Sequence, residues 1–143
     1  MSENNKPPIW FWIAAIVALI WNAMGVNAYL AQAYMSADTL AAMSELEQGM
    51  YADYPAWATA AFALAVWCGA LGSILLLLRK GLAYLVLVLS LLGIIVQMIY
   101  NVFMSKALEA YGPGGLVMPI MVLIIGIALV WLAKIGKARG WLS

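Results

Sequence analysis

The stretch from Pro8 to Met35 constrains the fold more than any other feature, because it contains no charged residue and no histidine. A helix rises 1.5 Å per residue, so a helix of this length crosses a hydrocarbon layer of about 30 Å with residues to spare. Three more stretches of similar character follow. Only 9% of the 143 residues are charged, against about 25% in ordinary soluble domains. We therefore expect one membrane domain, residues 1–143.

The four apolar stretches predict an all-α membrane protein, a bundle of four transmembrane helices. We place these helices at about residues 9–35, 56–78, 82–103 and 116–133. The turn Arg79-Lys80-Gly81 is so short that the second and third helices must be antiparallel neighbours. Pro55 and Pro119 each fall in a first helical turn, where proline is tolerated.

Residues 36–55 form the only sizeable polar region and predict a short amphipathic helix in the first outer loop. Ser36 or Asp38 is suited to cap its N-terminus, and apolar residues recur after it at about helical spacing. Gly49 is suited to end it. The loop contains four acidic residues and no Lys or Arg.

The basic residues divide unevenly between the two sides that four spans define. Lys106 alone falls on the side of the acidic loop. Because Lys and Arg accumulate in cytoplasmic loops, this distribution predicts that both termini are cytoplasmic and that loop 36–55 faces outward. We expect Trp141, in the basic tail after the fourth helix, to lie at the membrane interface. The residues on the side of the termini are Lys6, Arg79, Lys80, Lys134, Lys137 and Arg139.

The ionisable residues argue against catalysis and against a cofactor. The chain has no histidine, and every Asp, Glu, Lys and Arg lies outside the four predicted spans. Zinc, di-iron and histidine-ligated haem therefore have no ligands within the membrane. No nucleophile–base pair, phosphate loop or nucleotide motif is present. The net charge of +1 gives no basic patch for nucleic acid. We expect a non-enzyme without metal or cofactor.

Neutral polar residues form one stripe on each of two predicted helices. Residues three or four positions apart share a helix face, and both helices run outward, so the two stripes reach similar depths. One interpretation is that these groups join helices by hydrogen bonds. The other is a polar cavity, open to the outer face, that holds a small neutral ligand. The candidate ligand-binding residues are Asn22, Tyr29 and Gln32 on the first helix and Gln97, Tyr100 and Asn101 on the third; Gly25, Ser90 and Gly93 lie within the same stripes.

The second predicted helix presents a face of small residues, which lets another backbone approach closely. Packing against the first or third helix of the same chain is one interpretation, and homo-oligomerisation through this face is the other. The residues of this face are Ala61, Ala65, Gly69, Gly72 and Ser73.

Several tryptophan, glycine and amide positions resemble a group of small bacterial four-span proteins that lack an established function and are sometimes labelled sugar transporters. In topology the chain is also similar to DoxX-like membrane proteins. The resemblance implies an inner-membrane location and functional interest in Asn22, Tyr29 and Gln32. The matching residues are Trp21-Asn22-Ala23-Met24-Gly25, Tyr29, Gln32, Tyr54-Pro55-Ala56-Trp57, Trp67, Gly69, Gly72 and Leu76-Leu77-Leu78-Arg79.

Three classes of function remain open from the sequence. The first is a binding, structural or accessory membrane protein, with the lipid bilayer and a larger membrane complex as its partners. The second is an oligomeric transporter or channel for a small neutral solute, which needs assembly because four helices leave little room for a path. The third, an enzyme acting on lipid or quinone, lacks an acid or base.

Overall fold

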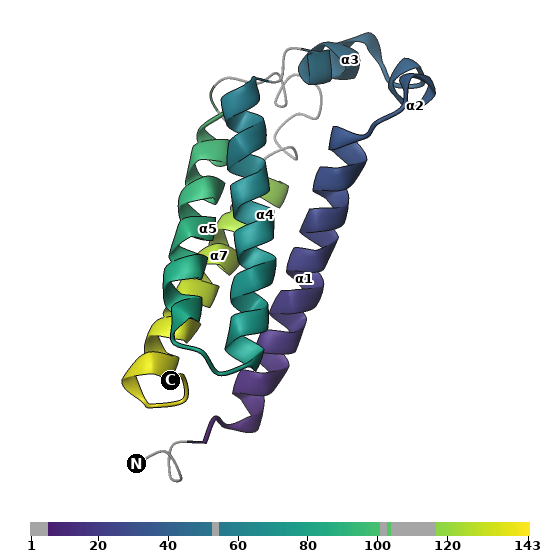
Figure 1. Cartoon of the computed structure of the whole chain (residues 1–143). Helices are drawn as coiled ribbons and strands as arrows, with labels where there is room; N and C mark the ends of the chain where they lie inside the picture. Colours follow the sequence, from purple (N-terminus) through teal and green to yellow (C-terminus); the bar gives the residue numbers. More distant parts are fainter. Residues whose placement is uncertain (1–5, 53–54, 101–102, 104–116) are drawn as a thin grey trace.

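A computed structural model of the chain, described here for residues 6–52, 55–100, 103 and 117–143, shows an all-α four-helix bundle (Figure 1). Its four long helices are accompanied by two short ones, α2 and α3, that follow α1. The elements are α1 (Ile9–Ala33), α2 (Ala37–Ala41), α3 (Glu45–Ala52), α4 (Ala56–Leu77), α5 (Leu82–Ile99) and α7 (Val117–Ala138).

The long helices pack in the order α1, α4, α5 and α7. α4 packs against both α1 and α5, and α7 packs against α5. Among the described residues, α1 and α7 make at most isolated contacts with each other. The start of α1, the C-terminus and the α4–α5 turn lie at one end, which we call the basic end, whereas α2 and α3 lie at the opposite loop end (Figure 1).

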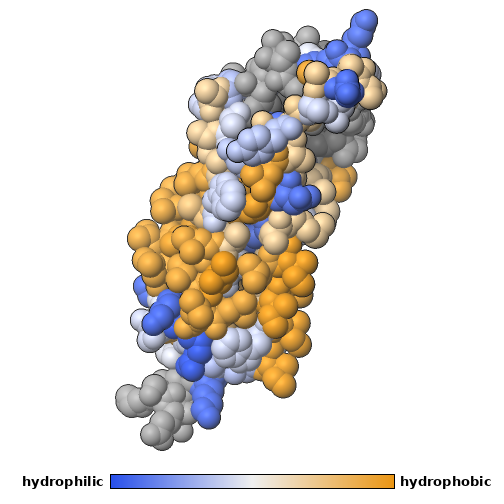
Figure 2. Space-filling view, turned by 45° about the vertical axis from the view of Figure 1, so that its right-hand side comes forward, coloured by the Kyte–Doolittle hydropathy of each residue, from blue (hydrophilic) through white to orange (hydrophobic). Residues whose placement is uncertain are grey.

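All four long helices are long and apolar enough to cross a membrane. Large apolar side chains such as Ile9, Val17 and Met24 are mostly exposed, as expected for helices that face lipid. Figure 2 shows apolar residues covering the middle of one face, with polar residues gathered mostly toward the two ends. The chain is therefore a multi-pass membrane protein.

The tight turn after α4 has a defined geometry. Arg79 adopts a left-handed conformation with φ of 58°. Its N–H donates to the Leu76 carbonyl over 3.0 Å, and the N–H of Lys80 donates to the Leu75 carbonyl over 2.9 Å. These bonds form a Schellman motif, which satisfies the last carbonyl groups of α4. The predicted antiparallel pairing of the second and third long helices is confirmed.

A second Schellman motif ends α7 and turns the chain back into the bundle. Gly140 supplies the left-handed position with φ of 77°, and the N–H of Trp141 donates to the Gly136 carbonyl over 2.8 Å. The Arg79 Nε atom donates to the Trp141 carbonyl over 2.8 Å, and the N–H of Ser143 donates to the Arg79 carbonyl over 2.9 Å. The C-terminal segment is therefore fastened to the α4–α5 turn.

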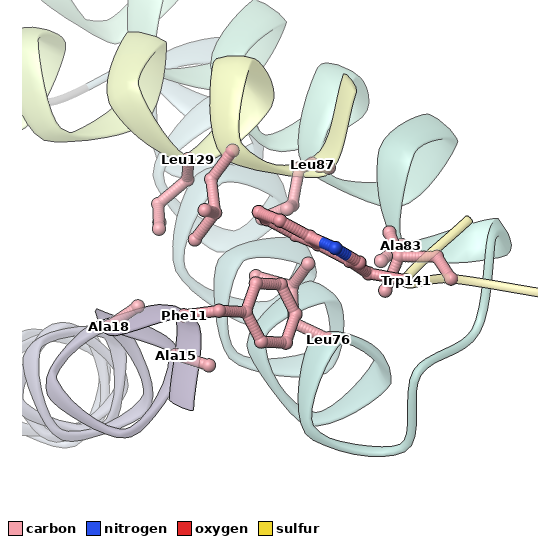
Figure 3. Close-up of a cluster of buried hydrophobic side chains, with 11 residues drawn as sticks. Phe11, Ala15, Ala18, Leu76, Ala83, Leu87, Leu129 and Trp141 are labelled. Atoms are coloured by element: carbon pink, nitrogen blue, oxygen red, sulfur yellow. The ribbon is translucent and has the colours of Figure 1, made fainter. Parts of the chain in front are cut away.

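A cluster of buried apolar side chains lies in the basic half of the bundle. Phe11 and Leu76 are fully buried there, and Trp141 is 6% exposed. The Trp141 ring makes edge contacts with the rings of Trp10 and Phe11, each at 5.5 Å between centroids. Figure 3 shows the Trp141 and Phe11 rings side by side between α1 and α5. We call this group the basic-end cluster: Phe11, Ala15, Ala18, Leu76, Ala83, Leu87, Leu129, Leu132, Ala133, Trp141 and Leu142.

The structure corrects two expectations for the C-terminal region. Trp141 is a core residue and not an interfacial one, because the motif at Gly140 directs it inward. The fourth long helix also continues past the expected end at Ala133 to Ala138, so Lys134 and Lys137 belong to a helix. Lys137 lies at the basic end, where its ammonium group is 5.4 Å from the centre of the Tyr84 ring.

The first loop also differs from its prediction. Two short helices replace the single expected one, and Gly49 lies inside α3 and does not end it. Ser36 does cap α2, because its hydroxyl oxygen accepts from the N–H of Thr39 over 3.1 Å. The residues expected to form the second loop, including Lys106, lie outside the described residues.

Candidate ligand cavity

A cavity of about 380 Å³ extends from the middle of the bundle toward the loop end, and all four long helices line it. α1 and α7 form its two sides, and α4 and α5 form its back, which follows from the packing order of the helices. Leu87 and Leu129 close its inner end, and both belong to the basic-end cluster. Among the described helices, the gap between α1 and α7 is the side that is packed least.

The walls of the cavity are mostly apolar. Trp21 and Met24 contribute from α1, Ile94 from α5, and Val122 and Ile125 from α7. No residue lining the described part of the cavity is charged. The polar lining residues are Asn22, Ser90 and Gln97.

Asn22 anchors a group of polar residues that joins three helices, which we call the polar cluster: Asn22 on α1, Ser73 on α4 and Ser90 on α5. The Asn22 amide nitrogen donates to the Ala18 carbonyl over 2.8 Å and to the Ser73 hydroxyl over 3.3 Å. Ser73 donates to the Gly69 carbonyl over 2.8 Å. Ser90 donates to the Ala65 carbonyl over 2.6 Å. The hydrogen bonds of Asn22 and Ser90 between helices therefore both end on α4.

Glycine lets the three helices come together at this level. A Cβ atom added at Gly69 would lie 2.8 Å from Cγ of Asn22 and 3.2 Å from Oγ of Ser90. A Cβ atom added at Gly93 would lie 2.8 Å from the carbonyl oxygen of Ala61. Both glycines therefore mark close approaches to α4 that any larger residue would disturb.

The small-residue face of α4 is used inside the chain. Ala61, Ala65, Gly69, Gly72 and Ser73 are all buried, and they meet α1 and α5. Of the two interpretations offered by the sequence, packing within one chain describes these contacts. This face is therefore not presented to a second copy.

The predicted ligand-binding residues separate into three groups. Asn22 and Gln97 line the cavity. Tyr29 packs with its ring edge-on to Phe62 at 5.5 Å, and Tyr100 packs in the same way on Trp57 at 5.6 Å, so neither is among the lining residues.

The third group consists of Gln32 and Asn101. Gln32 is half-buried near the end of α1 and does not line the cavity. Asn101 lies outside the described residues. At Asn22 and Ser90 the two polar stripes do not bond to each other, because α4 lies between α1 and α5 and provides the hydrogen-bond partners of both residues.

Sequence reasoning did not single out the contribution of α7. Its lining residues, such as Val122 and Ile125, are apolar and resemble any lipid-facing position. Gly126 carried a usable signal, because glycine within a membrane helix indicates a close neighbour. A Cβ atom at Gly126 would lie 2.7 Å from Cδ1 of Ile94 on α5.

Comparison with known proteins finds no family model, no curated protein and no solved structure that matches this chain. The fold and the cavity therefore define its class: a small multi-pass membrane protein, a four-helix bundle with a mostly apolar cavity between α1 and α7.

Proposed function

We infer that this protein is a membrane-embedded binding protein that holds a small, neutral and mostly apolar molecule. The cavity carries this proposal: its volume of about 380 Å³ lies within the range of roughly 300–1,000 Å³ that ligand pockets occupy. Apolar walls with a few polar groups such as Asn22 and Ser90 are the usual composition of such pockets. The proposal includes no catalytic step, since the described lining residues offer no acid, base or nucleophile pair.

The packing order suggests how the molecule enters. α1 and α7 are the least closely packed neighbours, and both have apolar side chains on their outer surfaces. A molecule dissolved in the bilayer therefore reaches the cavity by passing between α1 and α7, without crossing the aqueous phase. A neutral molecule suits this route, because charge is costly inside the membrane.

The transport alternative requires more than the cavity. A path across the membrane through one copy must pass the basic-end cluster, where Phe11, Leu76 and Trp141 are at most 6% exposed. The expected assembly through the small-residue face of α4 is also without support, because that face is buried within the chain. We therefore favour binding over conduction.

A cavity-filling substitution tests the proposal. Ala28 and Ala23 are both exposed residues of α1, but only Ala28 lines the cavity. We expect native mass spectra of protein released from lipid nanodiscs to show a retained small molecule for the wild type and for Ala23→Trp. Ala28→Trp, at comparable folded yield, should lose it. Equal retention by both variants, or none by the wild type, would refute the proposal.

We place the protein in the inner membrane of a bacterium, with both termini in the cytoplasm. The support is the cluster of positive charges at the basic end and the resemblance to small bacterial four-span proteins. Cysteine labelling tests the orientation in a Cys68→Ala background. On intact cells, a membrane-impermeant maleimide should react with Ala37→Cys and not with Lys80→Cys, and the reverse pattern would show the opposite orientation.

A further inference from the structure

We propose that the molecule held in the cavity carries a hydrogen-bond donor, such as a hydroxyl group, on an otherwise apolar body. This inference rests on the proposed binding function and assigns the chemical class of the ligand. It follows from the direction of the hydrogen bonds in the polar cluster.

The polar hydrogen atoms of the polar cluster are all donated to acceptors within the protein. Ser73 donates its hydroxyl hydrogen to Gly69, and Ser90 donates its own to Ala65. Because Ser73 has used its hydrogen, it can only accept from Asn22, which identifies the atom facing Ser73 as the amide nitrogen. The second hydrogen of that nitrogen goes to the Ala18 carbonyl. No hydrogen of these three side chains remains for a ligand.

The carbonyl oxygen of Asn22 is the group left for a ligand. No described residue donates a hydrogen bond to this Oδ1 atom. No buried side-chain oxygen or nitrogen in the described part of the chain lacks a partner, so Oδ1 is not sealed off. Asn22 lines the cavity, and its Oδ1 lies against Gly69 on α4, where an added Cβ atom would overlap it. Gly69 has no side chain that could donate, so we assign the missing donor to a ligand in the cavity. Near the middle of a membrane, an acceptor without a donor is unfavourable.

A ligand that matches this arrangement has a donor that faces Oδ1 at hydrogen-bond distance and apolar atoms against Trp21, Ile94 and Val122. A hydroxyl or N–H group meets this requirement, whereas an ether or ketone of the same shape brings a second acceptor and leaves Oδ1 unsatisfied. Gln97, which also lines the cavity, has an interaction partner in the protein. Lipid alcohols and small phenols share the required chemistry.

Matched probes test the proposal with the full chain in nanodiscs. We would measure, by equilibrium dialysis against protein-free nanodiscs, the binding of a 4-alkylphenol, of its methyl ether and of the corresponding 4-alkylacetophenone. A neutral hydrogen bond is worth about 0.5–1.5 kcal/mol, so the phenol should bind about 2- to 10-fold more tightly than the ether. The ketone should bind no better than the ether.

Variants locate the preference at Asn22. In Asn22→Leu the phenol and the ether should bind equally, because the acceptor is replaced by apolar atoms of similar size. Tyr29→Phe should keep the preference of the wild type, since Tyr29 packs behind the lining residue Phe62 and does not itself line the cavity. Should Asn22→Leu fail to fold, the three-probe series on the wild type still decides the matter.

The outcomes separate the two proposals. Equal binding of phenol and ether by the wild type, or tighter binding of the ketone, would overturn the donor requirement and leave the binding function standing. Absence of saturable binding for all three probes would overturn both. Loss of the preference in Tyr29→Phe as well as in Asn22→Leu would show that the preference does not arise at Asn22.

Discussion

The substitution Gly93→Ala tests a close approach of α5 to the backbone of α4. The added Cβ atom would lie 2.8 Å from the carbonyl oxygen of Ala61 and 2.9 Å from the nitrogen of Ala65, both of which are backbone atoms of α4. Backbone atoms cannot rotate away as a side chain can. Because ordinary contact begins at 3.4 Å, α5 must move away from α4 by about half an ångström.

The expected cost follows from this separation. A gap of about half an ångström already forfeits a quarter or more of each dispersion contact along the interface, and overpacking typically costs about 1–3 kcal/mol. Alanine is a better helix former than glycine and returns about 0.5–1 kcal/mol. We therefore expect Gly93→Ala to lower the free energy of unfolding by about 1–2 kcal/mol.

Two further glycines provide controls of the same chemistry. Gly49→Ala in α3 should not destabilise the bundle, because no heavy atom lies within 4 Å of the added group. Gly25→Ala should give an intermediate effect, since the added atom meets only the side chain of Val66, whose Cγ1 methyl lies 3.1 Å away. The measurement is reversible unfolding in mixed micelles of a mild detergent and dodecyl sulfate, followed by tryptophan fluorescence. Equal stability of Gly93→Ala and Gly49→Ala would refute the packing of α4 on α5.

Two other predictions concern the basic-end cluster and the polar cluster. Trp141→Ala should lower the free energy of unfolding by about 3 kcal/mol, since a buried ring is removed, whereas Trp131→Ala, with 56% of that residue exposed, should change it little in the same assay. A double-mutant cycle of Asn22→Ala and Ser73→Ala should give a coupling energy of about 0.6–1.7 kcal/mol. A coupling of zero would show that the bond between the two residues contributes nothing to stability.

The fold was predictable because membrane helices can be recognised in a sequence by their length and hydropathy. The long apolar run from Pro8 to Met35 fits a membrane-spanning helix and not a helix of a soluble domain. The three-residue turn at Arg79 left only an antiparallel pairing of the helices on either side. The boundaries of α4 came within a residue of the prediction for the same reason. Hydropathy does not predict which helices pack against each other, because lipid-facing and helix-facing positions can both be apolar. The position of α4 between α1 and α5 therefore emerged only from the structure.

The site was predictable to a smaller extent. Asn22 and Gln97 stood out as amides within apolar helices, and both line the cavity. Tyr29 stood out for the same reason but packs on aromatic rings, because a tyrosine has enough apolar surface to serve as a packing residue. Trp141 was misplaced because a tryptophan next to basic residues is typical of an interface. The glycine before it, followed by two apolar residues, was the signal of a chain that turns inward.

The same features explain why the cavity lies in only one half of the bundle. Four helices in the order α1, α4, α5 and α7 leave a gap between the first and the last at every level of the membrane. At the basic end the returning segment fills this gap with Trp141 and Leu142, which contact α1 through Phe11 and α7 through Gly136. In the loop half, no described residue from outside the four helices lines the gap. The cavity therefore arises because the C-terminal segment fills the gap between α1 and α7 only at the basic end. The polar cluster lies where the filled part ends and the cavity begins.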